Sequence, residues 1–195
     1  MPELVISGNI VLSDRIYKGK IIVRNGRISK IARPSESLDA QLSLEFDDCY
    51  ILPGIIDSHV HFRDPGLSNK EDFGTGSRAA AVGGVTTVID MPNTVPWVTN
   101  AQVLEKKKEA LKNSSYVDYG LSAALSPSET QSLIDITKSG AISFEGFTAD
   151  VPTRYLLDSD FVILKKLEDL AKVGTLGAFY SENQSLWKGF LEIFL

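Results

Sequence analysis

The sequence predicts an α/β fold with a parallel sheet of the (β/α)8 barrel type, of which only about the first five strand–helix units are present. From Gly54 onward, short apolar runs typical of buried strands alternate with longer stretches that have the apolar spacing of helices. Repeated strand–helix units require a parallel sheet, either a barrel or a doubly wound sheet. Two histidines, His59 and His61, follow the first of these apolar runs. Because barrels carry their chemistry at the C-terminal ends of their strands, this placement favours the barrel.

Residues 1–53 have a different pattern and are predicted to form a separate, small β unit. Short runs that alternate apolar and polar side chains lie at residues 4–6, 10–12, 20–23 and 27–31. Between the last two runs, Asn25-Gly26 is a strong signal for a two-residue hairpin turn. The polar stretch from Ala32 to Asp47 is interpreted as a loop between strands.

Residues 54–195 are predicted to hold about five strands and four helices. The strands are expected at 55–62, 85–91, 116–124, 141–148 and 175–181, and the helices at 72–82, 100–112, 127–138 and 160–173. Ser126-Pro127-Ser128-Glu129 is a capping box that predicts the start of the third helix, and Gly174 predicts the end of the fourth. The charge run from Glu105 to Glu109 predicts a solvent-exposed face on the second helix.

The bulk properties exclude several classes of protein. The chain has 195 residues with 43% hydrophobic content, which is enough to bury a core. A net charge of -5 and a pI near 5.1 argue against a nucleic-acid surface, which needs a basic face. No long uncharged apolar stretch and no signal peptide are present, so we expect a soluble cytoplasmic protein that binds no membrane. The single Cys49 is predicted to be a small buried side chain and not a nucleophile.

The segment around His59 and His61 carries the strongest chemical signal. Side chains two apart on a strand share a face, so both imidazoles and the nearby Arg63 are predicted to point into one pocket. Paired imidazoles suit a transition metal such as zinc, and the planar guanidinium fork suits a carboxylate. An isolated His-x-His is more often structural. Here the chain has only two histidines and places both within three residues, which favours a functional site.

Three motifs lie close together in this part of the chain. They are Asp57-Ser58-His59-Val60-His61-Phe62-Arg63-Asp64-Pro65-Gly66, Gly83-Gly84-Val85-Thr86-Thr87-Val88 and Met91-Pro92-Asn93-Thr94. With them the chain resembles the cyclic amidohydrolases, most closely the dihydroorotases of the longer, allantoinase-like type. The resemblance implies that residues 1–53 belong to a β-sandwich and that residues 54–195 are the N-terminal portion of a metal-dependent hydrolase TIM barrel. Such a barrel takes about 250 residues, so we expect an incomplete barrel from a truncated chain or a fragment.

The resemblance also implies a set of site residues. His59 and His61 match two ligands of a binuclear metal centre, and Glu145 stands where the family has a bridging carboxylated lysine. Tyr180 stands where the family has a further histidine, and the catalytic aspartate is expected beyond the C-terminus. At most one zinc ion is therefore expected, held by His59, His61 and Glu145. Arg63 and Asn93 match the positions that hold the substrate carboxylate and ring.

The implied function is a dihydroorotase-like cyclic amide hydrolysis that interconverts dihydroorotate and N-carbamoyl-aspartate in pyrimidine biosynthesis. One alternative is another cyclic amidohydrolase of the allantoinase or hydantoinase type. Those relatives generally share the two histidines but not the arginine, so Arg63 is the discriminating residue. A second alternative is a non-catalytic dihydroorotase-like subunit that scaffolds a partner such as aspartate transcarbamoylase. The small-molecule substrate is then the principal ligand, and a homo-oligomer or that enzyme is the expected protein partner.

Overall fold

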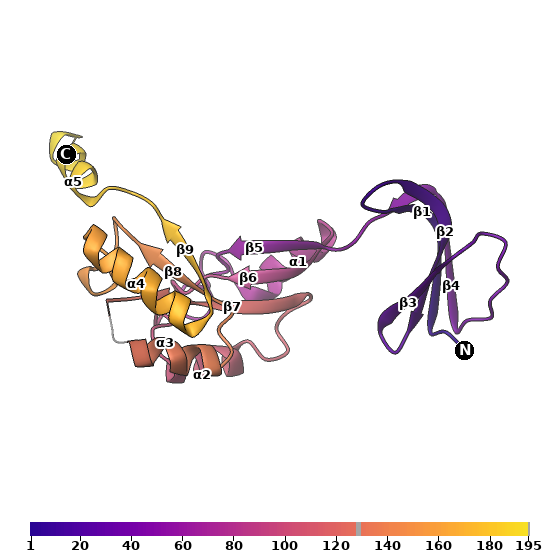
Figure 1. Ribbon diagram of the computed structural model, residues 1–195, viewed down its shortest axis with the longest axis horizontal. Helices are drawn as coiled ribbons and strands as arrows, with labels where there is room; N and C mark the ends of the chain where they lie inside the picture. The colour runs from indigo at the N-terminus through magenta and orange to yellow at the C-terminus, as the bar shows by residue number, and fades with distance from the viewer. Residues whose placement is uncertain (128–129, 195) are drawn as a thin grey trace. The chain divides into compact units, whose positions relative to one another are not determined.

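The computed structural model describes residues 1–127 and 130–194 of the chain. The chain divides into two compact units, Met1–Gly54 and Ile55–Leu195, which are labelled by element in Figure 1. Among the described residues, no helix is long and apolar enough to cross a membrane.

The first unit is a four-stranded sheet with strand order β3-β2-β1-β4. Its strands are β1 (Leu4–Val11), β2 (Ile16–Arg24), β3 (Arg27–Ala32) and β4 (Leu42–Ile51). The predicted hairpin is confirmed, because β2 and β3 pair antiparallel across Asn25 and Gly26, whose φ angles are 52° and 67°. Two successive positive φ angles are what a type I′ turn requires, and asparagine and glycine tolerate them. Whether this sheet belongs to a sandwich stays a prediction.

The predicted loop from Ala32 to Asp47 is wrong in its second half, because β4 begins at Leu42 and pairs parallel with β1. Most side chains of β4 are exposed, as expected for a strand at the edge of a sheet, so its charged residues carry no burial cost. The charged residues of this segment are typical of a loop and led to that prediction. The alternation of Leu42, Leu44 and Phe46 is typical of a strand and was overlooked. Cys49 lies in this strand and is exposed, so the prediction of a buried cysteine is also wrong.

The second unit is a five-stranded parallel sheet with strand order β5-β6-β7-β8-β9. The strands are β5 (Ile55–Val60), β6 (Val85–Asp90), β7 (Asp118–Leu125), β8 (Ser143–Phe147) and β9 (Leu176–Tyr180). The helices are α1 (Phe73–Val82), α2 (Ala101–Ala110), α3 (Thr130–Lys138), α4 (Asp160–Val173) and α5 (Gln184–Phe194), with a 3-10 turn η1 (Thr153–Tyr155). Each of the first four strands is followed by a helix before the next strand begins, so the predicted α/β fold of the (β/α)8 type is confirmed.

Side-chain caps explain where several helices begin and end. The Asp72 side chain accepts a hydrogen bond of 2.8 Å from the Thr75 backbone at the start of α1, and Ser159 caps α4 in the same way. Gly174 ends α4 with a left-handed φ of 73°, as predicted. The capping box predicted for the third helix includes Ser128 and Glu129, which lie outside the described residues.

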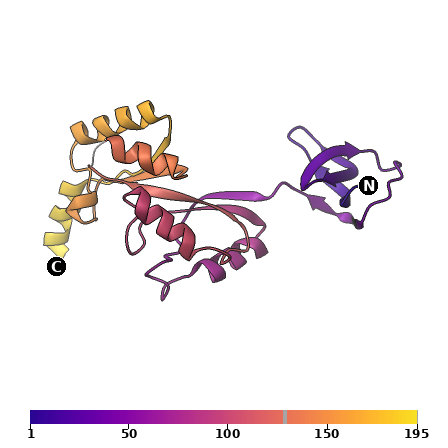
Figure 2. The same cartoon turned by 90° about the horizontal axis from the view of Figure 1, so that it is seen from below.

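The core of the second unit lies between the sheet and a layer of helices. Successive helices pack side by side, α2 against α3 and α3 against α4, while α1 packs on β6 and α4 on β9 (Figures 1 and 2). Phe73 of α1 is fully buried, and its ring lies 5.0 Å from the rings of both Phe62 and Tyr119. Phe62 lies two residues past the end of β5, between His61 and Arg63, so this aromatic cluster anchors the segment that carries both.

The charge run on α2 is only partly exposed, and the prediction of a wholly solvated face is wrong at Lys107. This lysine is 2% exposed, and its Nζ atom lies 2.6 Å from Oδ2 of the buried Asp90. The neighbouring Lys106 is exposed, and Lys108 pairs with Glu105 at 2.9 Å, as helical spacing predicts. Helix α5 was not predicted, and it has no buried residue in the described structure.

Candidate active site

The C-terminal edge of the parallel sheet brings the predicted site residues together. His59 lies on β5, and His61 and Arg63 follow that strand. Asn93 lies in the connection that follows β6, the strand that pairs with β5. Glu145 projects from β8, and Tyr180 is the last residue of β9. Six residues from four strands thus meet at one edge, as parallel strands that end together allow.

The two imidazoles form the centre of the site. Their ring centroids lie 5.1 Å apart in an edge-to-face arrangement. Nδ1 of His61 lies 2.7 Å from Oδ1 of Asn93. With the amide oxygen as acceptor, Nδ1 of His61 carries the proton and Nε2 keeps its lone pair. A hydrogen bond of this kind orients an imidazole that serves as a ligand through its other nitrogen.

The Tyr180 hydroxyl lies between the two histidines. Its oxygen is 3.2 Å from Nε2 of His61 and 3.4 Å from Nε2 of His59. A phenol has one proton to donate, so it can donate to one of these nitrogens at a time. Burial raises the pKa of Tyr180, and the nearby Glu145 carboxylate raises it further. The phenol is therefore neutral near pH 7 and is a weak donor to a metal.

Glu145 is a buried carboxyl group without a hydrogen-bond partner among the described residues. It is 1% exposed, and neither of its oxygens accepts a hydrogen bond there. Its Oε1 atom lies 3.3 Å from Nε2 of His59, which is within ion-pair distance but does not meet hydrogen-bond geometry. Burial raises the pKa of Glu145 from 4.5 to about 7. Among the described residues, no hydrogen-bond donor compensates the charge of this carboxylate, and His59 can do so only when it is protonated.

Burial also lowers the pKa of His61, and the positive charge of Arg63 and the neighbouring His59 act in the same direction. The hydrogen bond to Asn93 opposes this effect. His61 is therefore kept neutral at physiological pH, and a neutral imidazole is the form that binds a metal ion.

Arg63 lines a pocket of about 370 Å³ beside the histidines. Asn93 and Tyr180 line the same pocket, together with Trp97 and Phe147. Arg63 adopts a φ of 62°, in the left-handed region that non-glycine residues seldom occupy. Its carbonyl oxygen accepts a hydrogen bond of 3.0 Å from the Leu67 backbone, which closes the turn. Backbone conformations of this kind concentrate at ligand-binding sites, where the surrounding structure holds them in place.

An aromatic wall closes one side of this pocket. The Trp97 ring stacks on Tyr155 with centroids 4.3 Å apart and lies 5.2 Å from Phe147, which in turn stacks on Tyr180 at 5.4 Å. No role for Trp97 could be predicted from the sequence, because the rings that contact it lie about 50 residues or more further along the chain. Asp90 and Lys107 were also missed as neighbours of the site. One signal was available: Lys107 is flanked at helical spacing by Leu104 and Leu111, both fully buried.

The donor chemistry of the site suits one divalent cation. His59 and His61 supply neutral nitrogens, and Glu145 supplies buried oxygens that lack a partner among the described residues. In the described part of the chain, however, no three His, Cys, Asp or Glu side chains are grouped closely enough to hold an ion. The Tyr180 hydroxyl contacts both imidazoles in their place. The sequence holds no third histidine, so among the described residues the donors at this site are two imidazoles and one carboxylate, a set suited to one ion and not to two.

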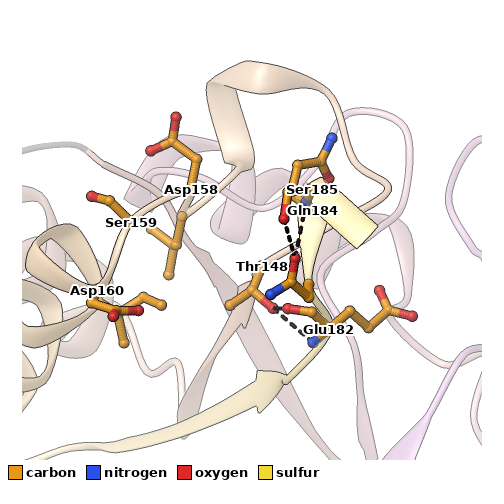
Figure 3. Close-up of a pocket in the computed structure, with 10 residues that line it drawn as sticks. Thr148, Asp158, Ser159, Asp160, Glu182, Gln184 and Ser185 are labelled. Carbon is orange, nitrogen blue, oxygen red and sulfur yellow. Dashed lines mark hydrogen bonds between the residues drawn. The ribbon is translucent and has the colours of Figure 1, made fainter. Parts of the chain in front are cut away.

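A second pocket lies beyond the ends of β8 and β9, and Figure 3 shows its lining. Three carboxylate side chains line it, from Asp158, Asp160 and Glu182. The Thr148 side chain donates to the backbone oxygen of Glu182 at 2.7 Å and accepts from its backbone nitrogen at 2.8 Å (Figure 3). None of the predicted site residues lines this pocket, so we place the candidate active site at the histidine pair.

Comparison with known proteins identifies similar sequences. The sequence profile of the family described as Dihydro-orotase-like matches residues 49–154. The chain is 30% identical over 187 residues to a dihydroorotase of Methanosarcina acetivorans, which covers 95% of the chain and 40% of that protein. It is 37% identical over 174 residues to a dihydroorotase of Methanothermobacter thermautotrophicus, a match that covers 80% of this chain and 40% of that protein. An allantoinase of Bacillus velezensis is 33% identical over 177 residues, a match that covers 90% of this chain and 38% of that protein.

Solved structures show the same architecture. An L-hydantoinase (dihydropyrimidinase) from Arthrobacter aurescens superposes with a TM-score of 0.92 at 26% identity, covering 99% of this chain and 44% of that one. A D-hydantoinase superposes with a TM-score of 0.83 at 25% identity, covering 97% and 42%. The chain thus spans about 40% of the length of the relatives that it matches.

Proposed function

The chain belongs to the Dihydro-orotase-like family, and from this premise we propose that it has a dihydroorotase-like function. The proposed reaction is the reversible hydrolysis of the cyclic amide of dihydroorotate to N-carbamoyl-aspartate, a step of pyrimidine biosynthesis in the cytoplasm. The observation that carries the proposal is Arg63 in one pocket with Asn93, directly beside the histidine pair. Both substrate and product bear a carboxylate, and a guanidinium binds a carboxylate through two parallel hydrogen bonds.

Each residue of the pocket has a proposed task. Arg63 binds the substrate carboxylate and fixes the orientation of the ring. The amide oxygen of Asn93 accepts a hydrogen bond from His61, so its two N–H groups can donate to a ring carbonyl of the substrate. The aromatic wall formed by Trp97 and Phe147 covers one face of the bound ring and excludes water from it.

His59, His61 and Glu145 are proposed to hold one divalent cation, with zinc the best match to two imidazoles and a carboxylate. When bound, such an ion supplies a Lewis acid that polarises an amide carbonyl and lowers the pKa of water. Asn93 keeps Nε2 of His61 free as a donor, and the burial of Glu145 favours a cation beside its carboxylate. The Tyr180 hydroxyl competes for both imidazoles and weakens the site.

A second candidate function is a non-catalytic subunit that binds the same ligands. It is favoured by the Tyr180 hydroxyl, which lies within hydrogen-bond distance of Nε2 of both His59 and His61 and can donate to one of them without a metal. Such a subunit would keep the carboxylate pocket around Arg63 and lack hydrolysis. Its partner would be a second copy of the chain or an enzyme that shares N-carbamoyl-aspartate, such as aspartate transcarbamoylase.

The test compares three cyclic amides with and without added zinc. Binding and hydrolysis are measured with dihydroorotate, allantoin and hydantoin, of which only the first carries a carboxylate. We expect dihydroorotate to bind at least tenfold more tightly than the other two. Zinc-dependent ring opening of dihydroorotate would support the enzyme, and binding without ring opening would support the subunit. Tighter binding of allantoin or hydantoin would overturn the proposal and point to another amidohydrolase specificity.

A further inference from the structure

A buried ion pair lies beneath the candidate active site and has no role in the proposed chemistry. Nζ of Lys107 on α2 lies 2.6 Å from Oδ2 of Asp90, the last residue of β6. The two residues are 2% and 0% exposed. Burial lowers the pKa of Lys107, while the carboxylate of Asp90 raises it and so favours the charged form of the lysine. A buried pair is often no more stabilising than well-packed apolar side chains, so its presence points to another purpose.

The remaining hydrogen bonds of the pair reach both segments that carry the substrate-binding residues. Oδ1 of Asp90 accepts a hydrogen bond of 2.8 Å from the backbone nitrogen of Phe62, which lies between His61 and Arg63 in the chain. Nζ of Lys107 donates to the backbone oxygen of Met91 at 3.1 Å. Met91 lies two residues before Asn93. One ion pair therefore holds the segments that follow β5 and β6.

These segments need such support because their own conformations are unusual or irregular. Arg63 holds a left-handed φ of 62° directly after the Phe62 amide that Asp90 binds. Asn93 lies in a connection without regular secondary structure, three residues past the end of β6. Charged hydrogen bonds are directional and short, so they fix the backbone more closely than apolar packing does. A shift of about 1 Å in either segment would separate the groups that bind one ligand.

We propose that Asp90 and Lys107 are positioning residues that hold Arg63 and Asn93 in register for a ring-bound carboxylate. This inference rests on the proposed function for the identity of the ligand, and on the hydrogen bonds of the pair for its mechanism. Neither residue lines the pocket that contains Arg63 and Asn93. Their effect on binding passes through the backbone of Phe62 and Met91.

The test uses the double variant Asp90→Leu/Lys107→Met, because either single change would leave one buried charge without its partner, and leucine removes the acceptor that the Phe62 backbone nitrogen uses. Binding of dihydroorotate is compared with binding of dihydrouracil, the same ring without the carboxylate. We expect the preference for dihydroorotate to fall at least tenfold. A variant that merely folds less well would lose affinity for both ligands equally and keep the preference. An unchanged preference in the folded double variant would overturn the inference.

The matched control is Lys166→Met/Asp169→Leu, which makes the same two changes in another buried lysine–carboxylate pair, 3.3 Å apart within α4. The control is expected to leave the preference unchanged. An equal loss of preference in the control would also overturn the inference, because the effect would then be general to buried pairs.

A measurement without ligand separates this inference from the proposed function. If the native chain shows no preference for dihydroorotate, carboxylate recognition fails, and amide hydrogen exchange then decides the role of the pair. In the double variant we expect the backbone amides of Phe62 and Thr94 to exchange at least tenfold faster, with amides inside β7 unchanged. Native exchange rates at both positions would overturn the positioning role.

Discussion

The hydroxyl oxygen of Tyr180 lies 3.2 Å from Nε2 of His61, on the nitrogen that the Asn93 hydrogen bond leaves free to bind a metal. The same hydroxyl reaches His59 at 3.4 Å. The Tyr180 side chain at the end of β9 thus lies between the imidazole of His59 on β5 and that of His61 just after this strand. The histidines can contact either the Tyr180 phenol or a bound cation. Mutation of Tyr180 should therefore shift the equilibrium between these two states.

Tyr180→His is predicted to increase zinc binding, because an imidazole replaces a neutral phenol as the fourth donor beside His59, His61 and Glu145. We expect at least tenfold tighter binding of one zinc ion, measured by titration and by elemental analysis after dialysis. Tyr116→His adds a histidine at an exposed position on another part of the unit and serves as the control. Equal zinc binding by both variants, or two tightly held ions in the native chain, would contradict the prediction.

Replacing Glu145 as well extends the same prediction. Glu145→Lys, combined with Tyr180→His, restores the residue types that the family has at both positions. We expect the zinc content of the double variant to exceed that of Tyr180→His alone when carbon dioxide is supplied, because a carboxylated lysine bridges two ions and a glutamate holds one. The measurement is the zinc-to-protein ratio with and without bicarbonate.

Glu145 is predicted to make the metal-free chain less stable as the pH rises. Below the unfolded-state pKa near 4.5, the carboxyl group is protonated in both states and carries no charge. Its folded pKa is raised to about 7, so stability is lost as the pH rises from about 4.5 through 7. At about 1.4 kcal/mol for each unit of pKa, the loss amounts to ~3 kcal/mol.

Urea unfolding from pH 4 to 8 in the presence of a chelator measures this effect. Glu145→Gln lacks the titrating group, so its free energy of unfolding should rise relative to the native chain over that range. Added zinc should remove much of the difference, since a cation compensates the buried carboxylate. If the free energy of unfolding changes with pH in the same way for both proteins, the charge of Glu145 is compensated in some other way.

The part of the site that could be predicted from the sequence is the part that local geometry determines. His59, His61 and Arg63 lie within five residues, and a strand that ends in a turn places them together whatever the rest of the chain does. Glu145 and Tyr180 were found only through the resemblance, because their contacts with His59 span 86 and 121 residues of sequence. The roles of His59, His61 and Glu145 as metal ligands, and of Arg63 and Asn93 in substrate binding, stay predictions.

The missed features share a physical cause. The exposed strand β4 carries charges that are usual in loops, and the buried Lys107 stands in a run of charges that is usual on helix surfaces. In both places, the position of the side chains relative to neighbouring elements determines whether they are exposed or buried. Lys107 is buried because Asp90 lies opposite it, and nothing in the sequence of α2 alone indicates that partner.

Lys107→Met is predicted to destabilise the fold strongly, and Lys106→Met is not. The first change leaves the carboxylate of Asp90 buried without its cation, which costs about 3–5 kcal/mol when one partner of a buried pair is removed. The second removes an exposed side chain and should change the free energy of unfolding by less than about 0.5 kcal/mol. Chemical unfolding of the two variants gives the comparison. Similar stability losses at both lysines would mean that the Asp90–Lys107 pair contributes little.

The described chain is predicted to associate with itself or with another protein through exposed apolar side chains. Ile56 on β5 is 65% exposed, and Phe190 and Ile193 on α5 are 57% and 72% exposed. Exposed apolar patches and open strand edges both favour association. Sedimentation should therefore show species larger than a monomer, and Phe190→Ser/Ile193→Ser should reduce them. A monodisperse native monomer with sharp, cooperative unfolding would contradict this prediction.

Arg63→Ala is predicted to abolish most carboxylate binding while leaving metal binding intact. Hydrogen bonds to a charged group contribute about 1.5–3 kcal/mol, so affinity for N-carbamoyl-aspartate should fall about tenfold to a hundredfold. Arg63→Lys keeps the charge but loses the planar fork, and it should recover only part of the affinity. Calorimetry with N-carbamoyl-aspartate, alongside zinc analysis of each variant, separates the two roles. Loss of zinc together with loss of the ligand would make Arg63 a support for the histidine pair, because a residue that only binds the carboxylate has no effect on the metal.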